Sequence, residues 1–234
     1  MTFVLVHGAW GGGWGWTPFA EAMRRRGHQV FTPTLTGMGE RSHLFSGAIN
    51  LSTHIEDICN VIRYERLRDF VLAGHSYGGM VVTGVADRMA DRIRSLVYID
   101  AFLPEDGRAL IDYTPGGVAA QLMDAGSRHG GLAVSVPSPW VLPGLSPAEQ
   151  AEIEALRGPQ PLGTLVEKIR LSGAGERIPR RMYILASENP GATFRRFYDG
   201  VRGRPGWEMA EVACGHGIHR ERPEELIPLL ERMA

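Results

Sequence analysis

The sequence predicts an α/β protein in which a mostly parallel sheet of six strands is covered by helices on both faces. Short apolar runs rich in β-branched residues alternate with longer amphipathic runs along the whole chain. This alternation is typical of parallel strands joined by crossover helices. The chain has 234 residues, 44% of them hydrophobic, so it is large enough to bury a full core. We therefore expect one domain with an insertion.

The first half of the chain predicts three strands and two helices. The strand runs are FVLVH, HQVFTPT and DFVLA, which begin at residues 3, 28 and 69. The run PFAEAMRRRG predicts a helix that ends at Gly27. The run LSTHIEDICNVIRYE predicts a second helix, with Ser52 or Thr53 as its N-cap.

The second half predicts three more strands, SLVYID, RRMYILA and WEMAEV, which begin at residues 95, 180 and 207. Helices are expected near ATFRRFYDGV and over RPEELIPLLERM. A long stretch rich in Pro and Gly separates SLVYID from RRMYILA, and AEQAEIEALRG and GTLVEKIRL within it resemble helices. A connection of that length is usually a functional lid. We therefore assign residues 1–103 and 180–234 to a core and residues 104–179 to a cap.

The composition excludes several classes of protein. The formal net charge is −1 and the sequence pI is near 6.7, so no basic surface for nucleic acid is expected. The two cysteines, Cys59 and Cys214, exclude a disulfide framework. The N-terminus has no leader pattern, and no run approaches 18 apolar residues, so we expect a soluble, cytoplasmic protein without a membrane contact. Whether it forms a homodimer stays open.

The motif GHSYGG at residues 74–79 follows the apolar run DFVLA and precedes a helix-like run. A serine in this context lies at a sharp turn between strand and helix, where its hydroxyl is exposed. The flanking glycines, Gly74 and Gly78, avoid collisions across the turn. A chance match in a glycine-rich chain is the competing interpretation. The strand before the motif and the helix after it favour Ser76 as a nucleophile.

A serine hydroxyl needs a base to take its proton, and His216 is the leading candidate. It follows the last predicted strand, which places it at the carboxyl edge of the sheet together with Ser76. His7 and His75 belong to the turns that shape this edge, and His219 lies one turn further along the chain. His216 and His219 lack a supporting cluster of carboxylates, so no metal site is predicted.

Acyl transfer also requires donors for the oxygen that becomes negative in the transition state. The run HGAW ends the first strand, where a backbone N–H can converge with that of the residue after the nucleophile. The predicted oxyanion donors are therefore Ala9 and Tyr77. A merely flexible turn would explain the glycines of this loop but not its coincidence with GHSYGG.

These motifs resemble the α/β-hydrolase superfamily, in the branch of plant methylesterases, hydroxynitrile lyases and bacterial esterase relatives. The resemblance rests on FVLVHGAWGGGWGW, RRRGHQV, GHSYGGM, VYIDAFLPEDG and the region around His216, and it covers nearly the whole chain. It implies an α/β-hydrolase fold and a serine enzyme that needs no cofactor, with a lid over a small apolar pocket.

One position departs from the pattern of this family. The acid that orients the histidine follows the strand matching RRMYILA in the family, and the matching residue here is Asn189. An asparagine carries no charge to stabilise an imidazolium. Asp100 ends the fourth strand and is the favoured replacement, because some members of the superfamily draw their acid from that strand. Glu188 is the other candidate, and its side chain is expected to point differently.

Two further differences separate the chain from the lyases of the branch, which by resemblance use a lysine after the histidine and a threonine in the oxyanion loop. Gly217 and Gly8 stand at these positions, which favours ester hydrolysis. Aromatic residues near the predicted site could enclose an apolar substrate or pack the lid on the sheet. Trp10 and Trp140 are the residues assigned to the pocket.

The sequence thus predicts an esterase for a small-molecule carboxylic ester, such as a methyl ester. Ser76 would attack the carbonyl, His216 would move the proton and Asp100 would orient His216. Asn189 motivates an alternative, a ligand-binding scaffold whose catalytic residues have decayed. A third hypothesis is a non-hydrolytic enzyme of natural-product metabolism that uses the same pocket.

Overall fold

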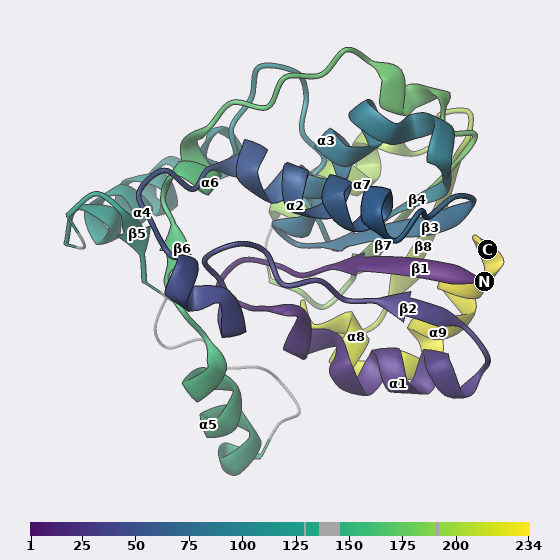
Figure 1. The fold of residues 1–234 in the computed structure, drawn as a ribbon, viewed down its shortest axis with the longest axis horizontal. Helices are drawn as coiled ribbons and strands as arrows, with labels where there is room; N and C mark the ends of the chain where they lie inside the picture. Colours follow the sequence, from purple (N-terminus) through teal and green to yellow (C-terminus); the bar gives the residue numbers. More distant parts are fainter. Residues whose placement is uncertain (129, 136–145, 191) are drawn as a thin grey trace.

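A six-stranded parallel sheet forms the centre of the molecule (Figure 1). The computed structural model describes residues 1–128, 130–135, 146–190 and 192–234. All strand pairs of the main sheet are parallel, as predicted. In spatial order the strands are β2 (Gln29–Phe31), β1 (Thr2–Val6), β3 (Phe70–His75), β4 (Ile93–Ile99), β7 (Arg180–Ala186) and β8 (Trp207–Val212).

Helices cover both faces of this sheet, and Figure 1 shows the two layers. One face carries α2 (Leu51–Tyr64), α3 (Gly78–Met89) and α7 (Ala192–Val201), and the other carries α1 (Thr17–Arg25), α8 (Ile218–Glu221) and α9 (Pro223–Arg232). Each face has its own apolar core. Side chains of a strand alternate between faces, so Val4 and Val6 join the first core and Phe3 and Leu5 the second. The prediction of helices on both faces is confirmed.

The described residues between β4 and β7 form short helices and a small second sheet. The longer of these helices are α4 (Gly116–Arg128) and α5 (Pro147–Leu156), and α5 lies apart from the sheet (Figure 1). A small antiparallel sheet joins β5 (Ala133–Val134) to β6 (Gln160–Pro161). The division into core and cap at residues 104–179 stays a prediction. Short helices complete the chain: α6 (Gly163–Val166) and the 3₁₀ helices Gly13–Trp16, Gly39–Leu44, Ala90–Arg92, Leu110–Tyr113 and Ala174–Arg177.

Two local predictions are wrong. The helix expected over residues 163–171 ends after Val166, because Glu167 leaves the helical conformation. Its carboxylate instead accepts hydrogen bonds from the backbone N–H and hydroxyl of Ser52, at 2.7 and 2.6 Å. Ser52 is therefore occupied by Glu167, and the N-cap of α2 is Asn50, whose side chain accepts a hydrogen bond from the Thr53 N–H.

No helix among the described residues is both long enough and apolar enough to cross a membrane. Both cysteines are free and buried.

Candidate active site

Ser76 lies at the tight turn between β3 and α3. Its φ angle is +55°, a left-handed conformation that is strained for a residue with a side chain. The neighbouring glycines allow the turn to close. A Cβ on Gly74 would lie 2.6 Å from the Gly78 carbonyl oxygen, and a Cβ on Gly78 would lie 2.7 Å from that of Val6. The expected collisions across the turn are therefore present in the geometry.

The loop that follows β1 packs directly against this turn. A Cβ on Gly8 would lie 3.1 Å from the Cβ of Ser76, so only a glycine fits there without displacement. His7 fixes the loop through both ring nitrogens: Nδ1 donates to the Gly8 carbonyl at 2.7 Å, and Nε2 accepts from the Leu35 N–H at 3.1 Å. Burial lowers the pKa of His7 to about 4, which keeps the ring neutral for both bonds.

The predicted oxyanion donors belong to the two segments that meet at Ser76. Ala9 belongs to the loop after β1, and among the described residues its N–H donates no hydrogen bond. Tyr77 is the N-cap residue of α3, where a backbone N–H has no acceptor inside the helix. The Tyr77 side chain points away and its hydroxyl contacts His54 Nδ1 at 2.8 Å. Tyr77 could therefore contribute its backbone alone.

His216 and Asp100 meet at the carboxyl edge of the sheet. His216 Nδ1 lies 2.6 Å from Asp100 Oδ2, and Asp100 is fully buried. A carboxylate only accepts, so Nδ1 carries the proton and Nε2 is left as the basic nitrogen. The second oxygen of Asp100 accepts from the Ala186 N–H at 3.2 Å. The structure thus brings His216 to Asp100.

Asn189 lies beside this pair without replacing the acid. Its Nδ2 donates to Asp100 Oδ2 at 2.6 Å and lies 3.4 Å from His216 Nδ1. The amide nitrogen must face Asp100, since a carboxylate offers no donor to an amide oxygen. Glu188 is exposed and has no side-chain contact with His216 among the described residues.

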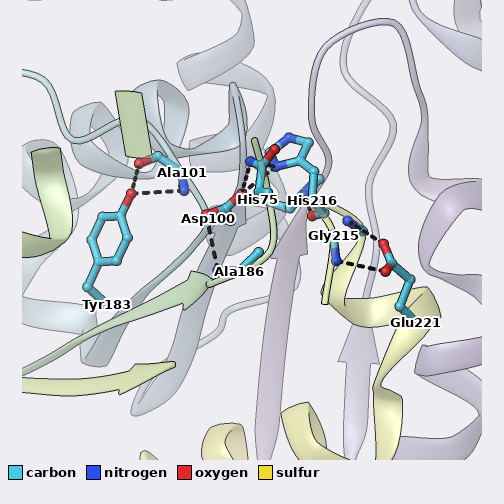
Figure 2. Close-up of polar contacts among 10 residues, drawn as sticks. His75, Asp100, Ala101, Tyr183, Ala186, Gly215, His216 and Glu221 are labelled. Atoms are coloured by element: carbon cyan, nitrogen blue, oxygen red, sulfur yellow. Dashed lines mark hydrogen bonds and ion pairs between the residues drawn. The ribbon is translucent and has the colours of Figure 1, made fainter. Parts of the chain in front are cut away.

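Three residues that the sequence analysis did not assign to the site hold His216 and Asp100 in place (Figure 2). His75 Nε2 donates to the His216 carbonyl oxygen at 2.8 Å. Glu221 accepts from the backbone N–H groups of Gly215 and Gly217, at 2.8 and 3.2 Å. The Tyr183 hydroxyl hydrogen-bonds to Ala101, the residue after Asp100. The contacts of His75 and Tyr183 join segments far apart in the sequence, whereas those of Glu221 span six and four residues, and no sequence motif marks any of them.

Comparison with known proteins identifies the family. A model of the alpha/beta hydrolase family matches residues 3–229. The chain belongs to the alpha/beta hydrolase family. It is 42% identical, over 96% of each chain, to a carbendazim hydrolyzing esterase from a Nocardioides species. It is 29% identical to methylesterase 2 of Arabidopsis thaliana, over 66% of this chain and 64% of that one.

A solved structure shows the same architecture over the full length. It is an extracellular alpha/beta-hydrolase from a Paenibacillus species, described as sharing structural and functional homology with tobacco salicylic acid binding protein 2. The TM-score is 0.88 and the identity 25%, over 100% of this chain and 99% of that chain. The predicted resemblance to this branch of the superfamily is confirmed.

Ser76 and His216 of this alpha/beta hydrolase line one pocket of about 80 Å³. Trp10, a predicted pocket residue, also lines it. Trp10 in addition ties the loop after β1 to the segment between β4 and β7: its backbone N–H donates to Gln160 Oε1 at 3.1 Å and its indole N–H to the Val134 carbonyl at 3.0 Å. Trp140, the other predicted pocket residue, lies outside the described residues.

A larger cavity of about 660 Å³ opens between α3 and α7. Its lining includes Tyr98, Tyr113 and Trp207 but neither Ser76 nor His216. The smaller pocket is therefore the candidate active site of this hydrolase, since it contains the reactive groups. Among the described residues, no group of three or more His, Cys, Asp or Glu side chains could hold a metal ion.

Proposed function

We propose that the protein is a serine esterase that hydrolyses small carboxylic esters through an acyl-enzyme. The contact of 2.6 Å between His216 Nδ1 and Asp100 Oδ2, beside a strained serine in the same pocket, is the observation that carries this proposal. A neutral histidine whose Nδ1–H is held by a buried carboxylate presents Nε2 as a base.

The two chemical steps follow from this arrangement. Ser76 Oγ attacks the ester carbonyl while His216 Nε2 takes its proton, and the Ala9 and Tyr77 N–H groups stabilise the resulting oxyanion. His216 then donates that proton to the departing alcohol, which leaves an acyl group on Ser76. Water, deprotonated by His216, attacks the acyl carbonyl and releases the acid, and the proton returns to Ser76. Asp100 stabilises the imidazolium in both steps.

The relatives support the choice of ester hydrolysis. The Nocardioides relative is named an esterase that hydrolyses carbendazim, and the Arabidopsis relative is named a methylesterase. Methyl esters, in which methanol is the alcohol released, are therefore the first substrates to test. The alternative of a scaffold with decayed catalytic residues was motivated by Asn189. The contact between Asp100 and His216 weighs against it, because a buried carboxylate faces the histidine.

Replacement of the nucleophile tests the proposal. Ser76→Ala should lower kcat on a neutral activated ester, p-nitrophenyl acetate, by at least about 1000-fold, because the covalent step is lost. Ser42→Ala, at an exposed serine, is the matched control and should keep wild-type activity. Full activity of Ser76→Ala would show that the hydrolysis does not use this residue.

A further inference from the structure

Two arginines line the same pocket as Ser76 and His216. Arg220 lies in α8, four residues after His216, and Arg157 directly follows α5. The Gly158 N–H donates to the Trp10 carbonyl oxygen at 3.4 Å, which ties the chain beside Arg157 to the oxyanion loop. The two guanidinium groups are thus held at the site by different parts of the fold.

Arg220 is held with its donors available. Its guanidinium carbon lies 5.2 Å from the centre of the Trp14 ring, and a Cβ on Gly15 would lie 3.2 Å from its Nη2. Stacking on an aromatic ring uses the face of the guanidinium, while its N–H donors lie in the plane. Among the described residues, none accepts a hydrogen bond from this side chain. The stacked arginine can therefore bind a ligand through its edge.

The electrostatics of the pair favour an anion. Burial lowers the pKa of Arg220, the positive charge of Arg157 lowers it further, and no carboxylate among the described residues offsets these effects. Burial also lowers the pKa of Arg157, and Glu154 acts in the opposite direction. Two positive charges beside one pocket favour the binding of an anion there. Guanidinium groups bind carboxylates with strong, often bidentate hydrogen bonds.

We propose that Arg157 and Arg220 form a subsite for a carboxylate on the substrate, so that the preferred substrates are small esters with a second, ionised carboxyl group. This inference rests on the proposed esterase function and names its substrate class. The small pocket, of about 80 Å³, favours substrates with a few carbon atoms between the ester and the carboxylate. Half-esters of short dicarboxylic acids meet both conditions.

A pair of matched esters tests the subsite. Monomethyl succinate carries the second carboxylate, whereas dimethyl succinate presents the same acyl chain without charge. The wild type should have the higher kcat/KM for the half-ester. Arg220→Gln and Arg157→Gln should each lower that value by about 10- to 100-fold, the usual effect of losing a hydrogen bond to a charged group, and change the value for the diester by less than about threefold.

Two control variants separate recognition from a structural effect. Arg220→Lys keeps the charge and should retain part of the preference for the half-ester, whereas Arg68→Gln, at an exposed arginine, should leave it unchanged. A variant that only loosens the segment around Trp14 would lower the kcat/KM values for the half-ester and the diester equally. An equal wild-type kcat/KM for the two esters, or an unchanged ratio in Arg220→Gln, would overturn the proposal.

A binding measurement keeps this test independent of turnover. Succinate should bind to Ser76→Ala in a calorimetric titration, with a dissociation constant at least tenfold weaker in the Ser76→Ala/Arg220→Gln double variant. If Ser76→Ala still hydrolyses the neutral ester, the proposed mechanism fails, and the titration still decides the anion site. If hydrolysis depends on Ser76 but succinate binds the two variants equally, the anion site alone fails.

Discussion

Asp100 and Asn189 share one side of His216, and their chemistry differs. Asp100 carries a charge and accepts the Nδ1 proton of His216, whereas Asn189 donates to Asp100. Asn189 therefore acts on the histidine through the carboxylate. Sequence reasoning reached Asp100 because it ends a central strand at the carboxyl edge. The donation from Asn189 could not be predicted, since it depends on how the chain turns after β7.

Substitution of the two residues separates their roles. Asp100→Asn should lower kcat by about 10,000-fold. The histidine loses its charged partner, and the tautomer that leaves Nε2 as the base is no longer favoured. Asn189→Ala removes one donor to Asp100 and should lower kcat by about 10- to 100-fold. Steady-state kinetics on p-nitrophenyl acetate measure both values. A larger loss in Asn189→Ala than in Asp100→Asn would reverse the assignment of the acid.

The loop after β8 is the element that delivers His216 to the site. Glu221 in α8 binds the backbone on both sides of His216, through Gly215 and Gly217. These two hydrogen bonds, which we call the Glu221 clasp, join a helix to the loop before it. His75 supports the loop from β3. The strands themselves were predictable, since apolar runs mark each one. The clasp was not, because nothing in the pattern of charges distinguishes Glu221 from the exposed acids of α9.

Glu221→Gln tests the clasp. The neutral amide offers one oxygen in place of two charged ones, so the loop should loosen and kcat should fall about tenfold with little change in KM. Glu225→Gln, at an exposed residue 3.7 Å from Arg222, is the matched control and should keep wild-type kcat. Wild-type kcat in Glu221→Gln would show that the loop holds His216 without it.

At the scale of the whole molecule, buried neutral histidines couple folding to pH. Burial lowers the pKa of both His7 and His54 to about 4, from an ordinary value of 6.5. His54 accepts from the Tyr77 hydroxyl through Nδ1 and donates to the Thr36 carbonyl oxygen through Nε2, so protonation would break the first bond. Between pH 6.5 and 4 these two histidines therefore bind protons in the unfolded chain but stay neutral in the folded protein.

The free energy of unfolding should consequently fall as the pH decreases from 6.5 towards 4, since the unfolded chain takes up protons first. Each of these histidines contributes a slope of up to about 1.4 kcal/mol per pH unit in that window. Urea denaturation at pH 7, 6 and 5 measures the slope. His54→Gln should reduce it, whereas His43→Gln, at an exposed histidine, should not. A free energy of unfolding that does not change between pH 7 and 5 would contradict this account.

The overall architecture was largely predictable, because apolar strand patterns that alternate with amphipathic helix patterns indicate a parallel sheet covered by helices on both faces. The segment between β4 and β7 was not, since its short elements take their form from contacts such as Glu167 with Ser52. Its anchoring at Trp10 likewise depends on Gln160, a residue 150 positions away in the sequence.

Labelling with a serine-directed fluorophosphonate, followed by peptide mass mapping, shows whether Ser76 is an activated nucleophile. We expect one adduct, located on Ser76, absent from Ser76→Ala and formed far more slowly in Asp100→Asn. An unmodified Ser76 in protein that still hydrolyses p-nitrophenyl acetate would contradict this expectation.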